Sequence, residues 1–268
     1  MDLKTLCELP GLSGREEAVR NAVRAEVQAR LPGATVALDG LGSVLVTRPA
    51  ADPGKPRVML AAHMDEVGLL VVSATDDGLL RFRAMGGVDA RVLVSKRVRV
   101  GYDTPAQPSL PGVIGAMAIH QQTAEDRKAV LPIDQLFIDI GAKDKAEAER
   151  LAPAGTPVTF DVAYTPFGDG LVIAKALDDR VGVHALLELL TVPYAGELTF
   201  AFTSQEEAGC RGAAAAGYRV QPDIALVLET TSANDLGDTP EALQVCRVGE
   251  GVCVSFMDNT SIGDAELY

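Results

Sequence analysis

The stretch RVMLAAHMDE, residues 57–66, decides how this sequence is interpreted. Residues 57–62 form a short and nearly continuous apolar run, which is typical of a strand buried on both faces in a parallel or mixed sheet. The run ends at His63, and Asp65 follows two positions later. Because sites in open α/β sheets form at the carboxyl ends of strands, the stretch predicts a buried strand that delivers polar side chains to such a site.

Strands and helices alternate on both sides of this stretch. Val19, Val23 and Val27 recur every four residues and predict a helix with one face on the core. The predicted strands are 35–38, 43–47, 171–177, 198–203, 224–228 and 252–257. The predicted helices after residue 170 are 179–190 and 211–217. This alternation indicates an α/β fold with a mostly parallel or mixed sheet flanked by helices.

Residues 68–165 follow a different pattern. They contain several short strand candidates at close spacing and a single short helical stretch at 143–151. Such spacing is typical of a small β-rich, barrel-like domain. We therefore predict that 1–67 and 166–268 form one α/β domain and that 68–165 is inserted into it.

The composition is that of a folded globular protein, with 47% hydrophobic and 23% charged residues in 268. The 24 Lys and Arg residues against 37 Asp and Glu residues give a net charge of −13, which disfavours nucleic acid as a partner because its backbone is also negative. No apolar run reaches the roughly 18 residues of a membrane span, so no membrane partner is expected. The 4 scattered cysteines predict free thiols and a cytoplasmic location.

Four of the predicted strands are followed by a histidine or a carboxylate. The side chains are His63, Asp178, Asp179, Glu206, Glu207 and Glu229. If the strands are neighbours in one sheet, these acids converge and resist ionisation unless cations lie between them. A mixture of imidazole and carboxylate groups suits zinc, cobalt or manganese. The pattern therefore predicts a metal site at the carboxyl edge of the sheet.

Three motifs in this order resemble the glutamyl aminopeptidase family of co-catalytic metallopeptidases, metallopeptidase family forty-two, which includes the tetrahedral aminopeptidases. The motifs are HMDEVG at 63–68, ALDDRVG at 176–182 and SQEEAGCRGA at 204–213. The likeness runs from about residue 5 to 268 and includes GVIG at 112–115 in the predicted insertion. It implies a dinuclear zinc-peptidase-like fold and a metal-dependent aminopeptidase activity.

The resemblance also implies a set of metal ligands. His63 and Glu229 would bind one divalent ion, Glu207 would bind a second, and Asp178 would bridge the two. The family commonly has aspartate where this sequence has Glu229, and the longer side chain can still bind. The ions would be zinc or cobalt.

Two further roles follow from the resemblance. Glu206 would be the general base that takes a proton from the water between the metals, and Asp65 would hold the imidazole of His63 in its tautomer. The peptide bond between Asp178 and Asp179 would be cis, as it is in the family.

The family's last metal ligand is a histidine that would lie beyond residue 268, in a C-terminal part that this chain lacks. We therefore expect the second metal to keep only Asp178 and Glu207 and to be held weakly, which leaves the activity of the 268-residue chain open. A packing role is the simpler interpretation of His184, and a packing or interface role that of His120, so neither is expected to replace that ligand.

The partners implied by the family are short peptide substrates and further copies of the chain, since the family assembles, often as dodecamers, through the inserted domain. Two alternatives to an aminopeptidase stay open. One is a related deacylase with the same dinuclear core, and the other is a scaffold that has kept the fold and lost catalysis.

Overall fold

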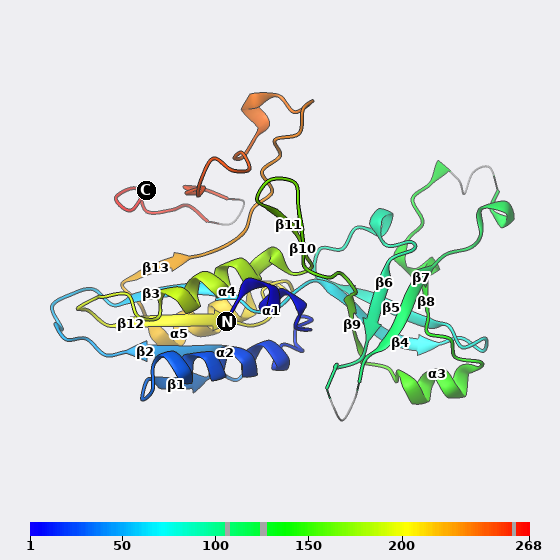
Figure 1. Ribbon diagram of the computed structural model, residues 1–268, viewed down its shortest axis with the longest axis horizontal. Coiled ribbons are helices and arrows are strands. Elements are labelled where there is room, and N and C mark those ends of the chain that lie inside the picture. The colour runs from blue at the N-terminus through cyan, green and yellow to red at the C-terminus, as the bar shows by residue number, and fades with distance from the viewer. Residues whose placement is uncertain (105–107, 124–127, 259–260) are drawn as a thin grey trace. The chain divides into compact units, whose positions relative to one another are not determined.

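The computed structural model describes residues 1–104, 108–123, 128–258 and 261–268. The chain divides into two compact units, Met1–Glu229 and Thr230–Tyr268. The larger unit contains a five-stranded mixed sheet with helices packed on it and a closed six-stranded barrel (Figure 1). This confirms the predicted α/β fold class with a barrel-like part. Across the described ranges, no helix is both long and apolar enough to cross a bilayer.

The mixed sheet has the strand order β1-β2-β12-β3-β13. Its strands are β1 (Thr35–Leu38), β2 (Val44–Arg48), β3 (Val58–His63), β12 (Leu198–Thr203) and β13 (Ile224–Val227). β1 and β2 pair antiparallel, and so do β2 and β12, whereas β3 runs parallel to both of its neighbours. In the pairing of β3 with β12, His63 lies opposite Thr203, so the two strands end together at one edge of the sheet.

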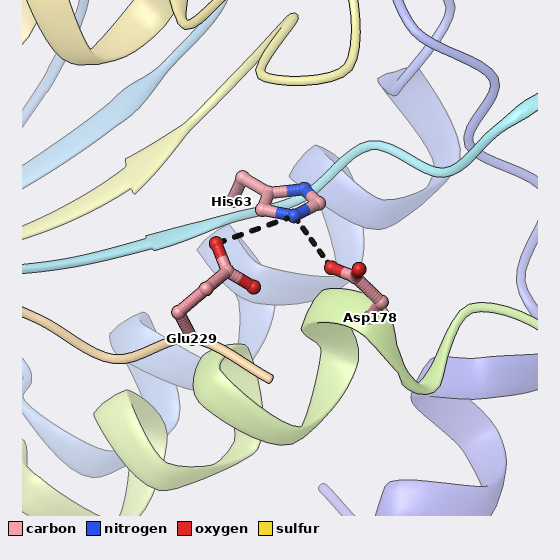
Figure 2. Close-up of side chains that lie close together, drawn as sticks. All are labelled: His63, Asp178 and Glu229. Carbon is pink, nitrogen blue, oxygen red and sulfur yellow. Dashed lines mark hydrogen bonds and ion pairs between the residues drawn. The ribbon is translucent and has the colours of Figure 1, made fainter. Parts of the chain in front are cut away.

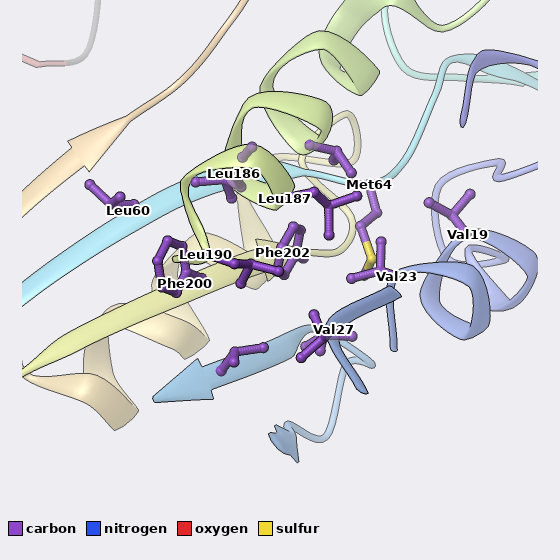
Figure 3. Packing of buried hydrophobic residues seen from close by; sticks show 14 of the residues in the cluster. Val19, Val23, Val27, Leu60, Met64, Leu186, Leu187, Leu190, Phe200 and Phe202 are labelled. Atoms are coloured by element: carbon purple, nitrogen blue, oxygen red, sulfur yellow. The ribbon is translucent and has the colours of Figure 1, made fainter. Parts of the chain in front are cut away.

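Helices cover both faces of this sheet. They are α1 (Leu3–Glu8), α2 (Glu17–Arg30), α4 (Leu177–Leu189) and α5 (Arg211–Val220). The valines predicted to face the core, Val19, Val23 and Val27 of α2, are fully buried against α4 and the sheet (Figure 3). On the opposite face, Ala216 of α5 packs with Met59 and Ala201. The apolar runs of β3 and β12 are therefore covered on both faces, as a strand without polar alternation requires.

The barrel has its own core. Its strands, in the order β4-β5-β8-β7-β6-β9, are β4 (Gly68–Ala74), β5 (Leu80–Met85), β6 (Arg97–Val100), β7 (Leu110–Gly115), β8 (Phe137–Asp139) and β9 (Pro157–Phe160). Its helical segments are η1 (Ala90–Val92), η2 (Ile119–Gln121), η4 (Ile133–Gln135) and α3 (Lys145–Leu151). Leu69, Leu80 and Ile138 are buried in the interior, because alternate residues of a closed barrel point inward.

The predicted strand 171–177 is only partly correct. Its first residues form β11 (Leu171–Ile173), which pairs with β10 (Thr165–Phe167) in a separate two-stranded ribbon and not with the main sheet. The extended conformation ends because Lys175 turns into the protein to bind the Leu9 carbonyl oxygen at 2.7 Å, and Ala176 then adopts a φ of 54°. Asp178 therefore enters the site from the start of α4 and not from the end of a sheet strand.

The predicted strand 252–257 is wrong. In the described part of the unit Thr230–Tyr268, regular structure consists of the short 3-10 helix η5 (Glu241–Leu243). Met257 makes an isolated bridge with Ile262. The side chains of 252–257 are exposed, and no strand among the residues that the structure describes pairs with them. β-propensity is a preference for a paired, half-buried surface, so an apolar alternation without a partner strand does not form a strand.

We expect Phe200→Ala to lower the free energy of unfolding by about 3–5 kcal/mol, since Phe200 is fully buried in the core under α2 and α4 and its removal leaves a cavity. Urea denaturation followed by circular dichroism measures the change. The exposed Tyr218 on α5 provides the control, because Tyr218→Ala should change stability by less than about 0.5 kcal/mol. Equal losses in the two variants would contradict this account of the core.

Candidate metal site

Three ligand atoms converge at the carboxyl edge of the sheet (Figure 2). His63 Nε2 lies 2.9 Å from Asp178 Oδ1 and 3.7 Å from Glu229 Oε2. One ligand atom from each of these residues lies within 4.8 Å of the others. The His63 side chain is buried, whereas those of Asp178 and Glu229 are 59% and 42% exposed. The donors therefore surround a point that is open to solvent on the carboxylate side, which fits a divalent ion that must also reach a substrate.

The sheet topology explains why two of these residues meet. His63 is the last residue of β3, and Glu229 follows the parallel neighbour β13. Asp178 arrives differently, in the irregular first turn of α4, where its φ and ψ are −81° and 108°. The peptide bond between Asp178 and Asp179 is cis, as predicted.

The hydrogen bonds of His63 leave Nε2 as the metal-binding nitrogen. Its Nδ1 lies 3.1 Å from the Asp65 backbone oxygen, and because a carbonyl oxygen can only accept, Nδ1 carries the proton. Once Nε2 has lost its own proton, the neutral ring offers the Nε2 lone pair to a metal ion on the side of Asp178 and Glu229. This is the usual way in which a backbone or carboxylate oxygen sets the tautomer of a metal-binding histidine.

Asp65 has a second contact that the sequence does not indicate, with the backbone of the loop after β12. One of its carboxylate oxygens lies 3.5 Å from His63 Nδ1, so the closer partner of the ring is the Asp65 backbone. The fully buried carboxylate instead accepts the backbone N–H groups of Glu206 at 2.9 Å and Glu207 at 3.1 Å. Asp65 therefore ties the loop after β12 to the loop after β3, because a buried carboxylate needs donors for its oxygens.

The loop after β12 brings Glu206 and Glu207 to the same edge. The Glu206 Oε1 atom accepts a hydrogen bond from Cys210 Sγ at 3.1 Å. Glu207 lies outside the three-residue group, although its carboxylate is close enough to Asp178 to interact with its charge. A Cβ atom at Gly86 would lie 2.9 Å from Glu207 Oε2, so the barrel strand β5 ends against this carboxylate.

The pKa values reflect how many acids meet here. Burial raises the pKa of Glu207 to about 7, and the charge of Asp178 adds to the effect. Burial and the charge of Glu229 raise the pKa of Asp179 to about 8. Burial lowers the pKa of His63, but hydrogen bonds to Asp178 and Asp65 outweigh this and raise it to about 11. The site thus holds protons at neutral pH that a cation displaces.

Two buried residues at the site, Asp179 and Arg180, have structural roles that the sequence-based prediction does not specify. Asp179 is fully buried, and its carboxylate accepts the backbone N–H of His63 at 3.2 Å and that of Gly182 at 3.0 Å. Arg180 is fully buried as well, in phase with the core residue Val183 three positions later. This spacing could have identified Arg180 from the sequence, because it places a charged residue on the core face of a helix. A charged residue there needs buried partners. His184 lies elsewhere, with Nδ1 3.2 Å from the Met1 backbone oxygen, as a packing role predicts.

Comparisons with known proteins identify the family of this chain. A model of the family described as M42 glutamyl aminopeptidase matches residues 42–268. The glutamyl aminopeptidase of Lactococcus lactis subsp. cremoris is 31% identical over 264 residues, which cover 96% of this chain and 72% of the relative. The TET aminopeptidase structure from Thaumarchaeota archaeon SCGC AB-539-E09 is 33% identical with a TM-score of 0.85 and covers 93% and 70% of the two chains. The TET1 peptidase of Pyrococcus horikoshii is 36% identical, with a TM-score of 0.75 and coverage of 89% and 71%.

We expect metal binding to release about one proton near pH 9, where Glu207 and Asp179 are already largely ionised, because His63 with a pKa of about 11 must lose its proton before Nε2 can bind the ion. The apparent affinity for zinc should then rise about tenfold per pH unit. Titration calorimetry in buffers of different ionisation enthalpy counts the protons. His184→Ala should leave that count unchanged, and a heat that does not depend on the buffer would contradict the prediction.

Proposed function

Because this chain belongs to the M42 glutamyl aminopeptidase family and is a metal-dependent aminopeptidase, we propose how its residues divide the work of peptide hydrolysis. His63 and Glu229 would hold one divalent ion, Glu207 would hold a second, and Asp178 would contribute to both. The single observation that carries this proposal is the group formed by His63, Asp178 and Glu229, whose ligand atoms lie within 4.8 Å of one another.

Zinc or cobalt is the proposed metal at both positions. One imidazole nitrogen with several carboxylate oxygens is a donor set that both ions accept. Glu207 and Asp178 supply the second position among the described residues, and the charge of Asp178 already acts on Glu207. When bound, the ions supply Lewis acidity toward the scissile carbonyl and toward water.

Glu206 is the proposed general base. Its backbone N–H is held by Asp65 at 2.9 Å, next to that of Glu207 at 3.1 Å, which anchors both glutamates in the loop after β12 at the carboxyl edge of the sheet. A Glu206 carboxylate oxygen takes a proton from the attacking water and then gives it to the nitrogen of the leaving amine. Asp65 contributes by keeping His63 and both glutamates in place.

The proposed substrates are short peptides with a free N-terminal amine. Relatives named lysyl aminopeptidase and glutamyl aminopeptidase support this substrate class. An N-acylated substrate has no free N-terminal amine. Family membership therefore favours an aminopeptidase over the deacylase and scaffold alternatives.

We further propose that the chain self-associates through 68–165 as an inserted domain, into a dodecamer. The Pyrococcus horikoshii TET1 peptidase can assemble into a tetrahedron or a large octahedral shell. The barrel part exposes large apolar side chains suited to such contacts: Val92, Val94, Val113, Met117 and Val130. A cytoplasmic location is also proposed, supported by four cysteines that are free of disulfides.

We expect Glu206→Gln to lower kcat by about 10²- to 10⁴-fold and to leave metal binding intact, because the amide cannot take up the proton. Hydrolysis of an aminoacyl-anilide panel measures the loss, with zinc or cobalt restored after chelation. The exposed Glu17→Gln is the matched control, and N-acetylated anilides should not be cleaved. A folded, metal-loaded chain that cleaves none of the panel would contradict the function, and full activity of Glu206→Gln would contradict the base.

We expect Val113→Glu to lower the oligomer mass measured by light scattering, because a charge in a buried apolar contact costs several kcal/mol. Val192→Glu, in the loop before β12, should leave the mass unchanged. A wild-type chain that is monomeric at micromolar concentration would contradict the proposed assembly.

A further inference from the structure

Asp178 lies in a segment that regular helical geometry does not hold. Ala176 precedes it with a φ of 54°, and Asp179 follows with φ and ψ of −119° and 44°. A residue outside the regular part of a helix is not held by the i to i−4 hydrogen bonds of the backbone. Besides the contact of its own carboxylate with His63 Nε2 at 2.9 Å, the position of Asp178 depends on contacts of the residues on either side.

On the C-terminal side of Asp178, two buried side chains bind the segment that carries His63. Asp179 Oδ2 accepts the His63 backbone N–H at 3.2 Å. Arg180 Nε donates to the Met64 backbone oxygen at 2.9 Å, and its Nη1 donates to the backbone oxygens of Leu6 and of Leu9, the latter at 3.2 Å. Arg180 thus fixes the first turn of α4 to the end of β3.

On the N-terminal side of Asp178, Lys175 makes the corresponding connection. Its Nζ donates to Glu66 Oε1 at 2.8 Å and Oε2 at 3.1 Å, and to the Leu9 backbone oxygen at 2.7 Å. The side chains are 8% exposed for Lys175 and 2% for Glu66. Glu66 Oε1 also accepts the Gly11 backbone N–H at 2.9 Å, so the carboxylate is itself held in place.

We propose that Lys175 is a positioning residue of the metal site, which sets the distance between Asp178 and His63 through its ion pair with Glu66. Lys175 precedes Asp178 by three residues and Glu66 follows His63 by three residues, so the pair joins the two ligand-bearing segments at matching points. The inference rests on the ligand roles proposed above for His63 and Asp178. Neither Lys175 nor Glu66 is one of the proposed ligands.

The charge balance of this cluster makes a clean test possible. Glu66 Oε1 lies 3.7 Å from Arg180 Nη2 as well as 2.8 Å from Lys175 Nζ, so one carboxylate faces two cations. Lys175→Met removes one positive charge and leaves Glu66 and Arg180 as a neutral pair. Because no buried charge loses its only counter-ion, the variant avoids the main cost of breaking a buried ion pair.

The test is the visible absorption spectrum and the cobalt affinity of the full chain loaded with Co²⁺. We expect Lys175→Met to change the positions or intensities of the d–d bands and to weaken cobalt binding by about tenfold or more, the effect typical of losing an outer partner of metal ligands. Lys175→Arg should restore both, since a guanidinium can donate to Glu66 and to the Leu9 oxygen together.

A matched control separates positioning from general stability. Glu188, also on α4, pairs with Arg30 at 2.8 Å and joins α4 to α2. Glu188→Gln should therefore leave the cobalt spectrum and affinity unchanged, whatever it does to the melting temperature. If Lys175→Met does not fold, Lys175→Gln, which keeps a donor without the charge, takes its place.

The outcomes distinguish this inference from the proposed function. An unchanged cobalt spectrum and affinity in the folded Lys175→Met variant would overturn the positioning role. A Lys175→Arg variant whose spectrum and affinity are as altered as those of Lys175→Met would overturn it as well. His63→Ala should abolish the cobalt bands. If His63→Ala leaves the cobalt bands intact, His63 is not a ligand. That outcome would contradict the proposed ligand set and, with it, the positioning role that rests on that set.

Discussion

The parallel alignment of β3 with β12 and β13 is the constraint on which the site depends. All three strands end at the same edge of the sheet, with Thr203 of β12 opposite His63 and Val227 of β13 opposite Ala61. A polar residue placed just after any of these strands must reach the same edge, because parallel strands share their direction. β3 and β12 are covered on both faces by helices, so their ends are held firmly.

This convergence concentrates negative charge, which the fold must compensate. The buried carboxylate of Asp65 receives two backbone N–H groups, and that of Asp179 receives two more. Such donors make it possible to bury an anion at acceptable free energy. The carboxylates nearest His63 Nε2, those of Asp178 and Glu229, are the ones that a divalent cation suits. Behind them, the cations Lys175 and Arg180 bind the chain segments together and face Glu66.

Much of this could be predicted from the residues themselves. The apolar runs 57–62 and 198–203 were sufficient to predict β3 and β12, since an uninterrupted run of that length has few other structures open to it. The run 171–177 was misleading, because its apolar residues continue past the point where Lys175 turns inward. The run 252–257 was misleading for another reason, because its alternation needs a partner strand that the described unit does not provide.

The sequence by itself determined the fold class, the barrel-like part and the identity of the residues at the carboxyl edge, because periodicity and residue chemistry are local properties. Only the tertiary structure decided how these residues act on one another. In the folded chain the Asp65 carboxylate accepts a hydrogen bond from the backbone of Glu206, and Lys175 forms an ion pair with Glu66, which lies 109 residues away in the sequence. A hydrogen bond or ion pair between distant segments depends on register and burial, and no local pattern in the chain encodes either of them.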